Sequence, residues 1–177
     1  MRLIDKLANY VFKKTTPIFR GNRKTMAIAD AKTVGILFDA TDWSEVRIIE
    51  KFVETLLIQG KAVRLFGFYN KKKLPPDYFS SLTDDIITRS DLNWIGIPKK
   101  DKYASMANEP LDLLLTLCTW HCMPLLMVSA ASKAKFRIGR YFSDSMHCFD
   151  FMLNIESDTT LDNFLTQILT FSTKMNT

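Results

Sequence analysis

Residues 33–68, TVGILFDATDWSEVRIIEKFVETLLIQGKAVRLFGF, decide the fold that this chain adopts. The uninterrupted apolar run at 33–38 is typical of a strand that is buried on both faces. Apolar side chains then recur at helical spacing over 42–59, a stretch that ends at Gly60, and a second apolar run follows at 62–68. A strand, a helix and a strand within 36 residues predict a right-handed crossover that joins two parallel strands.

The same alternation of strand and helix patterns continues toward the C-terminus. Apolar runs predict further strands at 86–88, 93–97, 111–117, 136–138 and 149–155. Helical patterns predict a helix over 124–133 and a last helix that begins after a cap at Asp158 or Thr159. Strands that alternate with helices indicate a single three-layer α/β domain with a sheet that is mostly parallel or mixed.

The N-terminal residues follow a different pattern. Residues 2–14 place apolar side chains on one helical face and basic side chains on the other, which predicts an amphipathic helix. Residues 15–32 combine proline, glycine and mixed charge, a composition typical of a linker. We therefore expect a basic N-terminal helix and linker at 1–32 and an α/β domain at 33–177.

The positive charge of the chain is concentrated in that N-terminal arm. Residues 1–32 carry eight basic and two acidic side chains, whereas the remaining 145 residues carry 16 basic and 17 acidic ones. Such an arm favours an anionic partner, either nucleic acid or the ribosome, or else the surface of a membrane. Its candidate anion-binding residues are Lys13, Lys14, Arg20, Arg23 and Lys24. A solvated tail that aids solubility would explain the same charge.

Composition limits the class of protein and its compartment. The chain has 177 residues, 47% hydrophobic and 24% charged, which excludes a disordered or fibrous protein. Its three cysteines argue against a disulfide framework and for a reducing compartment. The longest apolar run, 123–128, is far shorter than the ~20 residues of a transmembrane helix. The sequence thus predicts a cytoplasmic protein with no transmembrane segment.

Three segments resemble an uncharacterised family of small bacterial α/β proteins. These are residues 34–40 (VGILFDA), 91–96 (DLNWIG) and 111–139, which include LDLLLTL and PLLMVSAASKAKFRIG. The likeness covers about residues 33–175. It implies an α/β fold and a bacterial cytoplasmic setting, and it transfers no activity and no site residue.

Two carboxylates follow the first predicted strand. In an open parallel sheet, ligands bind beyond the carboxyl ends of the strands, and Asp39 ends the strand at 33–38. Asp39 and Asp42 together are candidate catalytic residues that can hold a cation or share a proton. The alternative is structural, because aspartate is also favoured at helix N-caps and in turns.

Two lysine runs follow other predicted strands and provide further candidate anion-binding residues. They are Lys71, Lys72 and Lys73, and then Lys99 and Lys100. If these strands are parallel to the first, both runs lie at the same end of the sheet as Asp39. Such a surface attracts phosphate-bearing ligands, and the nearby tyrosines 69, 78 and 103 are candidates for stacking on bases. Solvated surface lysines are the plainer interpretation.

Motifs for nucleotide, hydrolase and metalloprotease chemistry are absent from the sequence, and we predict no cofactor. All cysteines and histidines lie within 31 residues: Cys118, His121, Cys122, His147 and Cys148. Their spacing matches no standard zinc motif, so we predict no metal site. A metal or redox site at Cys118, His121 and Cys122 is the alternative. The sequence therefore favours a non-enzymatic binding protein that docks on an anionic partner. The alternative is a small enzyme that acts on an anionic substrate with Asp39 and Asp42.

Overall fold

A computed structural model describes residues 10–12, 14, 21, 23–76, 78 and 85–175 of the chain. Its strands are β1 (Thr33–Asp39), β2 (Ala62–Tyr69), β3 (Asp85–Thr88), β4 (Leu113–Leu117), β5 (Phe136–Arg140) and β6 (Phe151–Leu153). Its helices are α2 (Trp43–Ile58), α3 (Lys100–Asn108), α4 (Met123–Ala131) and α5 (Leu161–Lys174). Two short 3-10 helices, η1 (Arg89–Asp91) and η2 (Met146–Cys148), precede α3 and β6.

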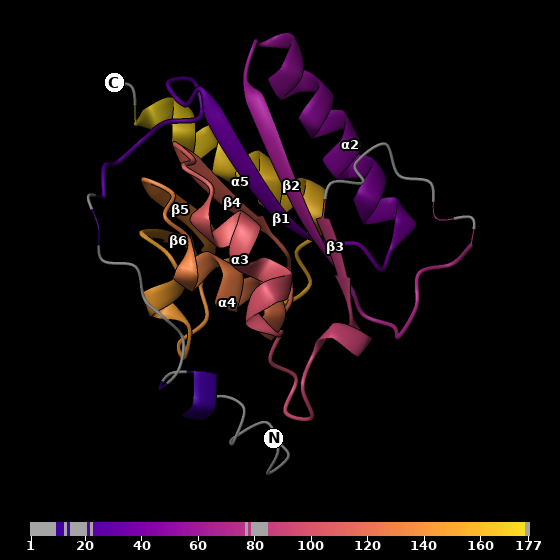
Figure 1. The fold of residues 1–177 in the computed structure, drawn as a ribbon. Coiled ribbons are helices and arrows are strands. Elements are labelled where there is room, and N and C mark those ends of the chain that lie inside the picture. The colour runs from indigo at the N-terminus through magenta and orange to yellow at the C-terminus, as the bar shows by residue number, and fades with distance from the viewer. Residues whose placement is uncertain are drawn as a thin grey trace.

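The described strands form one six-stranded parallel sheet in the order β3-β2-β1-β4-β5-β6 (Figure 1). β1 lies inside the sheet and pairs with β2 along its whole length, from Thr33 opposite Ala62 to Asp39 opposite Phe68. Its other neighbour is β4, which comes much later in the chain. This order is that of a doubly wound Rossmann fold, and it places the switch in strand order between β1 and β4.

Helices cover both faces of the sheet. Residues of α2 and α5 share one apolar cluster with Ile36 and Phe38 of β1. Residues of α3 and α4 share a second cluster with Leu37 of the same strand. Three successive side chains of β1 are therefore fully buried, which confirms that this strand is enclosed on both faces. Each such side chain contributes roughly 1.5–3 kcal/mol through burial.

The structure confirms the α/β class and differs from the prediction in several of its elements. The sheet is entirely parallel in the part of the chain described, and α3 was not predicted. The strand predicted at 93–97 is wrong, because Asn93 and Gly96 fold that segment into a turn. Gly96 has φ +83°, a conformation that side chains larger than glycine rarely adopt. The strand predicted at 149–155 shrinks to β6.

Part of the N-terminal arm packs against the α/β domain. Residues 10–12 and 14 are helical, and the remainder of the helix predicted at 2–14 lies outside the described residues. Phe12 is 1% exposed and belongs to an apolar cluster with residues of α4. Farther along, the amide of Ile28 donates a 2.6 Å hydrogen bond to Ser172 Oγ of α5. Phe12 of the predicted helix and Ile28 of the predicted linker therefore both contact the α/β domain.

Asp112, just before β4, ties three segments together at the amino end of the sheet. Its Oδ1 accepts a 2.6 Å hydrogen bond from Lys135 Nζ, and its Oδ2 accepts from the amides of Lys32 and Thr33 at 2.9 and 3.1 Å. The bond from Lys135, followed by those two amides, lowers the pKa of Asp112 to about 2 despite partial burial.

We expect Asp112→Asn to destabilise the fold at neutral pH and to make no difference in strong acid. Because the folded pKa lies below the ordinary 3.8, the carboxylate contributes its stability above pH ~4. That contribution is lost as the pH falls through about 2. Urea unfolding of both proteins between pH 7 and pH 2 checks this, and a stability gap that is independent of pH would contradict it.

Gly139 in β5 lets the ring of Phe149 lie directly on the strand. A Cβ at this position would lie 2.3 Å from Phe149 Cε1, and an aromatic ring cannot yield as the end of a flexible chain does. We expect Gly139→Ala to destabilise the protein by about 1–3 kcal/mol through overpacking. Denaturant unfolding measures this, and the double variant Gly139→Ala with Phe149→Leu should recover part of the loss.

Candidate functional site

The candidate site lies at the carboxyl end of the sheet, where β1 and β4 send their chains to opposite faces. Asp39 is the last residue of β1 and is 8% exposed. Its Oδ1 accepts a 2.8 Å hydrogen bond from the amide of Thr41, and its Oδ2 accepts a 2.7 Å bond from the indole of Trp120. Trp120 follows β4, so this bond links the two strands at the switch point. This bond holds the indole of Trp120 at the switch point.

Asp42 has the structural role of a helix N-cap. Its Oδ1 accepts hydrogen bonds from the amide and hydroxyl of Ser44 at 2.8 and 2.7 Å, which lowers the pKa of Asp42. Glu45 lies in the first turn of α2, and burial, followed by the charges of Asp39 and Asp42, raises its pKa. The structure thus brings three carboxyl groups to the start of α2, and both aspartates have hydrogen-bond partners there.

The tyrosines predicted as stacking platforms are largely enclosed. Tyr69 and Tyr103 are each 5% exposed, and Tyr78 packs between the rings of Tyr69 and Trp43 at centroid distances of 5.8 and 4.8 Å. Burial raises the pKa of Tyr78 to about 12, and its hydroxyl donates to the carbonyl of Ala40. Three tryptophans near this end are more exposed: Trp43, Trp94 and Trp120. They were not among the predicted binding residues.

Both predicted lysine runs lie beside the carboxyl ends of β2 and β3. The carbonyl of Lys71 accepts a 3.0 Å hydrogen bond from the amide of Arg89, and the carbonyl of Lys72 accepts one from Ser90 Oγ. These bonds join the loop after β2 to η1. We call the exposed cations of this region the basic patch: Lys71, Lys72, Lys73, Arg89, Lys99 and Lys100.

The basic patch has an excess of positive charge. Residues 70–76 and 88–102 contain seven basic and two acidic side chains. One of the acids, Asp91, is bound locally, because it forms a 3.3 Å ion pair with Lys102 and accepts hydrogen bonds from Thr88. Within the described part of the chain, no ion pair involves a side chain of the basic patch. Its six residues are exposed, and Lys71 Nζ also lies 6.0 Å from the centre of the Tyr69 ring.

A short hairpin extends from this patch between η1 and α3. Leu92 and Pro98 form an antiparallel bridge, the amide of Lys99 donates to the carbonyl of Asp91, and the amide of Asn93 donates to the carbonyl of Ile97. Trp94 lies at the tip and is 76% exposed. Figure 1 shows this loop projecting from the molecule at the end where the described N-terminal helical turn lies.

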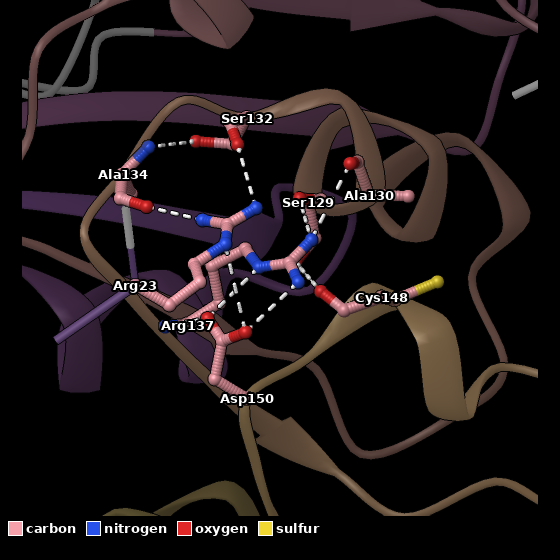
Figure 2. Close-up of polar contacts among 8 residues, drawn as sticks. All are labelled: Arg23, Ser129, Ala130, Ser132, Ala134, Arg137, Cys148 and Asp150. Atoms are coloured by element: carbon pink, nitrogen blue, oxygen red, sulfur yellow. Dashed lines mark hydrogen bonds and ion pairs between the residues drawn. The ribbon is translucent and has the colours of Figure 1, made fainter. Parts of the chain in front are cut away.

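The basic residues predicted as anion-binding in the arm differ in their exposure and position. Lys14 and Lys24 are exposed, and Lys13 and Arg20 lie outside the described residues. Arg23 instead turns inward at the opposite end of the sheet (Figure 2), where it donates to the carbonyls of Ser132 and Ala134.

The carboxylate of Asp150 organises two arginines in that inward cluster. Arg137 donates to both of its oxygens, at 3.1 Å from Nε and 3.0 Å from Nη2, and the Nε of Arg23 lies 3.7 Å from it (Figure 2). Burial, followed by the neighbouring charge of Arg137, lowers the pKa of Arg23. The cluster caps the last carbonyls of α4 and fastens the N-terminal segment to the domain.

The cysteines and histidines do not gather into one cluster. Among the residues described, no group of three or more potential metal-binding side chains is present. Cys118 and Cys122 are buried near each other, and burial raises the pKa of Cys122 well above its ordinary value. Cys148 is buried elsewhere, with its pKa raised to about 12. Thiols in such surroundings are poor nucleophiles.

One imidazole has a carboxylate partner. His121 Nε2 lies 3.1 Å from both Asp144 Oδ1 and Ser145 Oγ, beyond the carboxyl ends of β4 and β5. No local sequence pattern predicts this pairing, because Asp144 is 23 residues away from His121.

Two hollows lie away from the switch point. One is a groove of about 280 Å³ between α2 and α5, with an apolar floor that includes Phe52, Leu56 and Leu165. The other is a polar hollow of about 490 Å³ near the start of α5, lined by side chains such as Asn154, Asn163 and Gln167. Neither hollow includes Asp39 or the basic patch.

Fold and surface together define a doubly wound α/β protein with a basic patch at the carboxyl end of its sheet. The chain belongs to DUF6913, a family of unknown function, whose model matches residues 5–171. The match therefore includes most of the N-terminal arm as well as the sheet. Neither a curated protein nor a solved structure matches the chain. None of the helices in the described residues is both long enough and apolar enough to span a bilayer.

Proposed function

We propose that this protein is a non-enzymatic binding protein that docks on the phosphate backbone of nucleic acid through its basic patch. The observation that carries the proposal is the joining of two lysine loops at one end of the sheet by backbone hydrogen bonds. Lysine and arginine side chains held in solvent exchange their counterions for phosphates, and the release of those counterions drives binding. The exposed Lys14 of the arm adds positive charge at the end where Phe12 packs with Ile97, whereas Lys24 lies at the amino end of the sheet, where its amide donates to the carbonyl of Lys135.

Nucleic acid is favoured over a membrane surface by the way in which the arm packs. A basic amphipathic helix binds a bilayer by burying its apolar face among the lipids. In the described turn of the arm, Phe12 is buried against the protein's own domain and Val11 is half-buried. In this turn the two apolar side chains therefore already contact the protein itself, whereas Lys14 remains exposed to solvent.

The enzyme alternative rests on Asp39 and Asp42, and both have structural partners that account for them. Asp39 accepts from Thr41 and Trp120, and Asp42 caps α2. No observation specifically favours a reaction at this end of the sheet. A cytoplasmic location is part of the proposal, and it is supported by the three cysteines, which are free and buried.

A titration tests the proposed function directly. Fluorescently labelled 20-nucleotide oligouridine, titrated with the full chain at 50 mM salt, should show saturable binding by anisotropy with a Kd of about 10⁻⁶–10⁻⁴ M. Vesicles of anionic phospholipid, tested in parallel by sedimentation, should retain little protein. Absence of oligonucleotide binding, or binding to vesicles alone, would overturn the proposal.

A further inference from the structure

The hairpin that carries Trp94 is held rigidly, although its tip faces solvent. Asn93 Oδ1 accepts hydrogen bonds from the amides of Ile95 and Ile97 at 3.1 and 3.0 Å, and the amide of Gly96 donates to the carbonyl of Asn93. The amide of Asn93 also donates to the carbonyl of Ile97, so that four hydrogen bonds in all hold this turn. The backbone presents Trp94 in a fixed position.

The apolar side chains of the hairpin point inward, and its indole does not. Ile97 is 8% exposed and shares an apolar cluster with Phe12 and with Leu126 of α4, against which Ile95 also packs. Trp94, which directly precedes Ile95 in the chain, is 76% exposed. The fold has thus buried the aliphatic side chains and left a large flat ring in solvent.

The surroundings of this ring are cationic and aromatic. Lys99 and Lys100 lie at the base of the hairpin, where the amide of Lys99 bonds to Asp91. Phe12, in the same apolar cluster as Ile97, brings the N-terminal helical turn to this end, with Tyr10 61% exposed and Lys14 5.8 Å from its ring. Exposed rings interleaved with lysines are the pattern by which proteins hold single strands, the rings stacking on bases and the lysines pairing with phosphates.

We infer that Trp94 is a stacking platform for an unpaired base, so that the ligand of this surface is single-stranded nucleic acid. The inference rests on the proposed function and narrows its ligand class. A duplex keeps its bases stacked on one another. Its phosphates can contact the basic patch, but it has no unpaired base that can stack on the indole of Trp94. A membrane interface also accepts tryptophan, but the aliphatic side chains that would accompany it into lipid are turned inward here.

The test compares three proteins on two ligands. The native chain, Trp94→Leu and Trp94→Phe are titrated with labelled oligouridine and with a labelled duplex of the same length. We expect the native chain to prefer the single strand. Trp94→Leu should lose about tenfold or more of its affinity for the single strand and none for the duplex. Trp94→Phe, which keeps an aromatic face, should retain most of the affinity. Circular dichroism confirms that each exposed-site variant is folded.

The outcomes separate this inference from the proposed function. Equal affinity for both ligands, or single-strand affinity unchanged in Trp94→Leu, would overturn the inference and leave phosphate binding intact. The anionic vesicles used to test the proposed function provide a further check. If Trp94→Leu loses binding to these vesicles rather than to the oligonucleotide, Trp94 belongs to a membrane interface and the inference is also overturned. If the native chain binds neither nucleic acid, both proposals fail together.

Discussion

Asp150→Ala should lower the free energy of unfolding by about 3–5 kcal/mol, because it removes the partner of a buried guanidinium. The Arg137 side chain is 5% exposed and donates two hydrogen bonds to Asp150 at 3.0 and 3.1 Å. Its remaining bonds, to the carbonyls of Ser129 and Ala130, do not neutralise its charge. The substitution also removes the contact between Arg23 Nε and Asp150 (Figure 2).

A matched surface pair provides the control for that experiment. Lys102 forms a 3.3 Å ion pair with Asp91, but its side chain is 44% exposed and screened by water. Lys102→Ala should therefore cost about 1 kcal/mol or less. Both variants are measured by urea unfolding at neutral pH. A loss below about 1 kcal/mol in Asp150→Ala would contradict the role assigned to the cluster.

The triple variant Lys71→Gln, Lys72→Gln, Lys73→Gln should bind oligouridine about 100-fold more weakly at 0.1 M salt. Each lysine that neutralises a phosphate of a single strand contributes about 0.7 to the slope of log affinity against log salt. Three such contacts therefore account for about 2 in that slope and for about two decades of affinity at 0.1 M. The measurement is a series of anisotropy titrations between 50 and about 300 mM salt.

Its control removes the same charge elsewhere. Lys32, Lys51 and Lys133 are exposed and lie on α2 or at the amino end of the sheet. Their triple change to glutamine lowers the net charge equally and should alter the affinity by less than about threefold, since only long-range attraction is reduced. Equal losses in the two triple variants would mean that net charge, rather than the basic patch, controls binding.

Local patterns predict the elements of this fold better than they predict its surfaces. The segment 33–68 shows a buried strand, a helix with an aspartate cap and a second strand, and each pattern arises from neighbours in the chain. The order of the strands depends instead on long-range contacts such as those of β1 with β4. α3 escaped prediction because its first turn is rich in lysine, although Tyr103, Met106 and Ala107 have helical spacing and are buried.

The candidate site likewise combines features that local sequence patterns predict with features that depend on long-range contacts. Asp39 was predicted at the carboxyl end of β1, because strand ends are visible in the sequence. Its partner Trp120 is 81 residues away, and no local pattern connects the two. Trp94 was assigned to a strand, because an apolar run does not distinguish a strand from a hairpin whose side chains divide between core and solvent. The inward turn of Arg23 likewise depends on Asp150, far along the chain.

The most direct test of the account is a map of the bound oligonucleotide on the protein surface by NMR. Backbone amide shifts of the ¹⁵N-labelled chain, recorded with and without oligouridine, identify which residues the ligand approaches. The account predicts that the largest shifts fall in 70–73 and 88–100, the loops that carry the basic patch and Trp94. Shifts centred on the groove between α2 and α5, or on the cluster of Arg137 and Asp150, would contradict it.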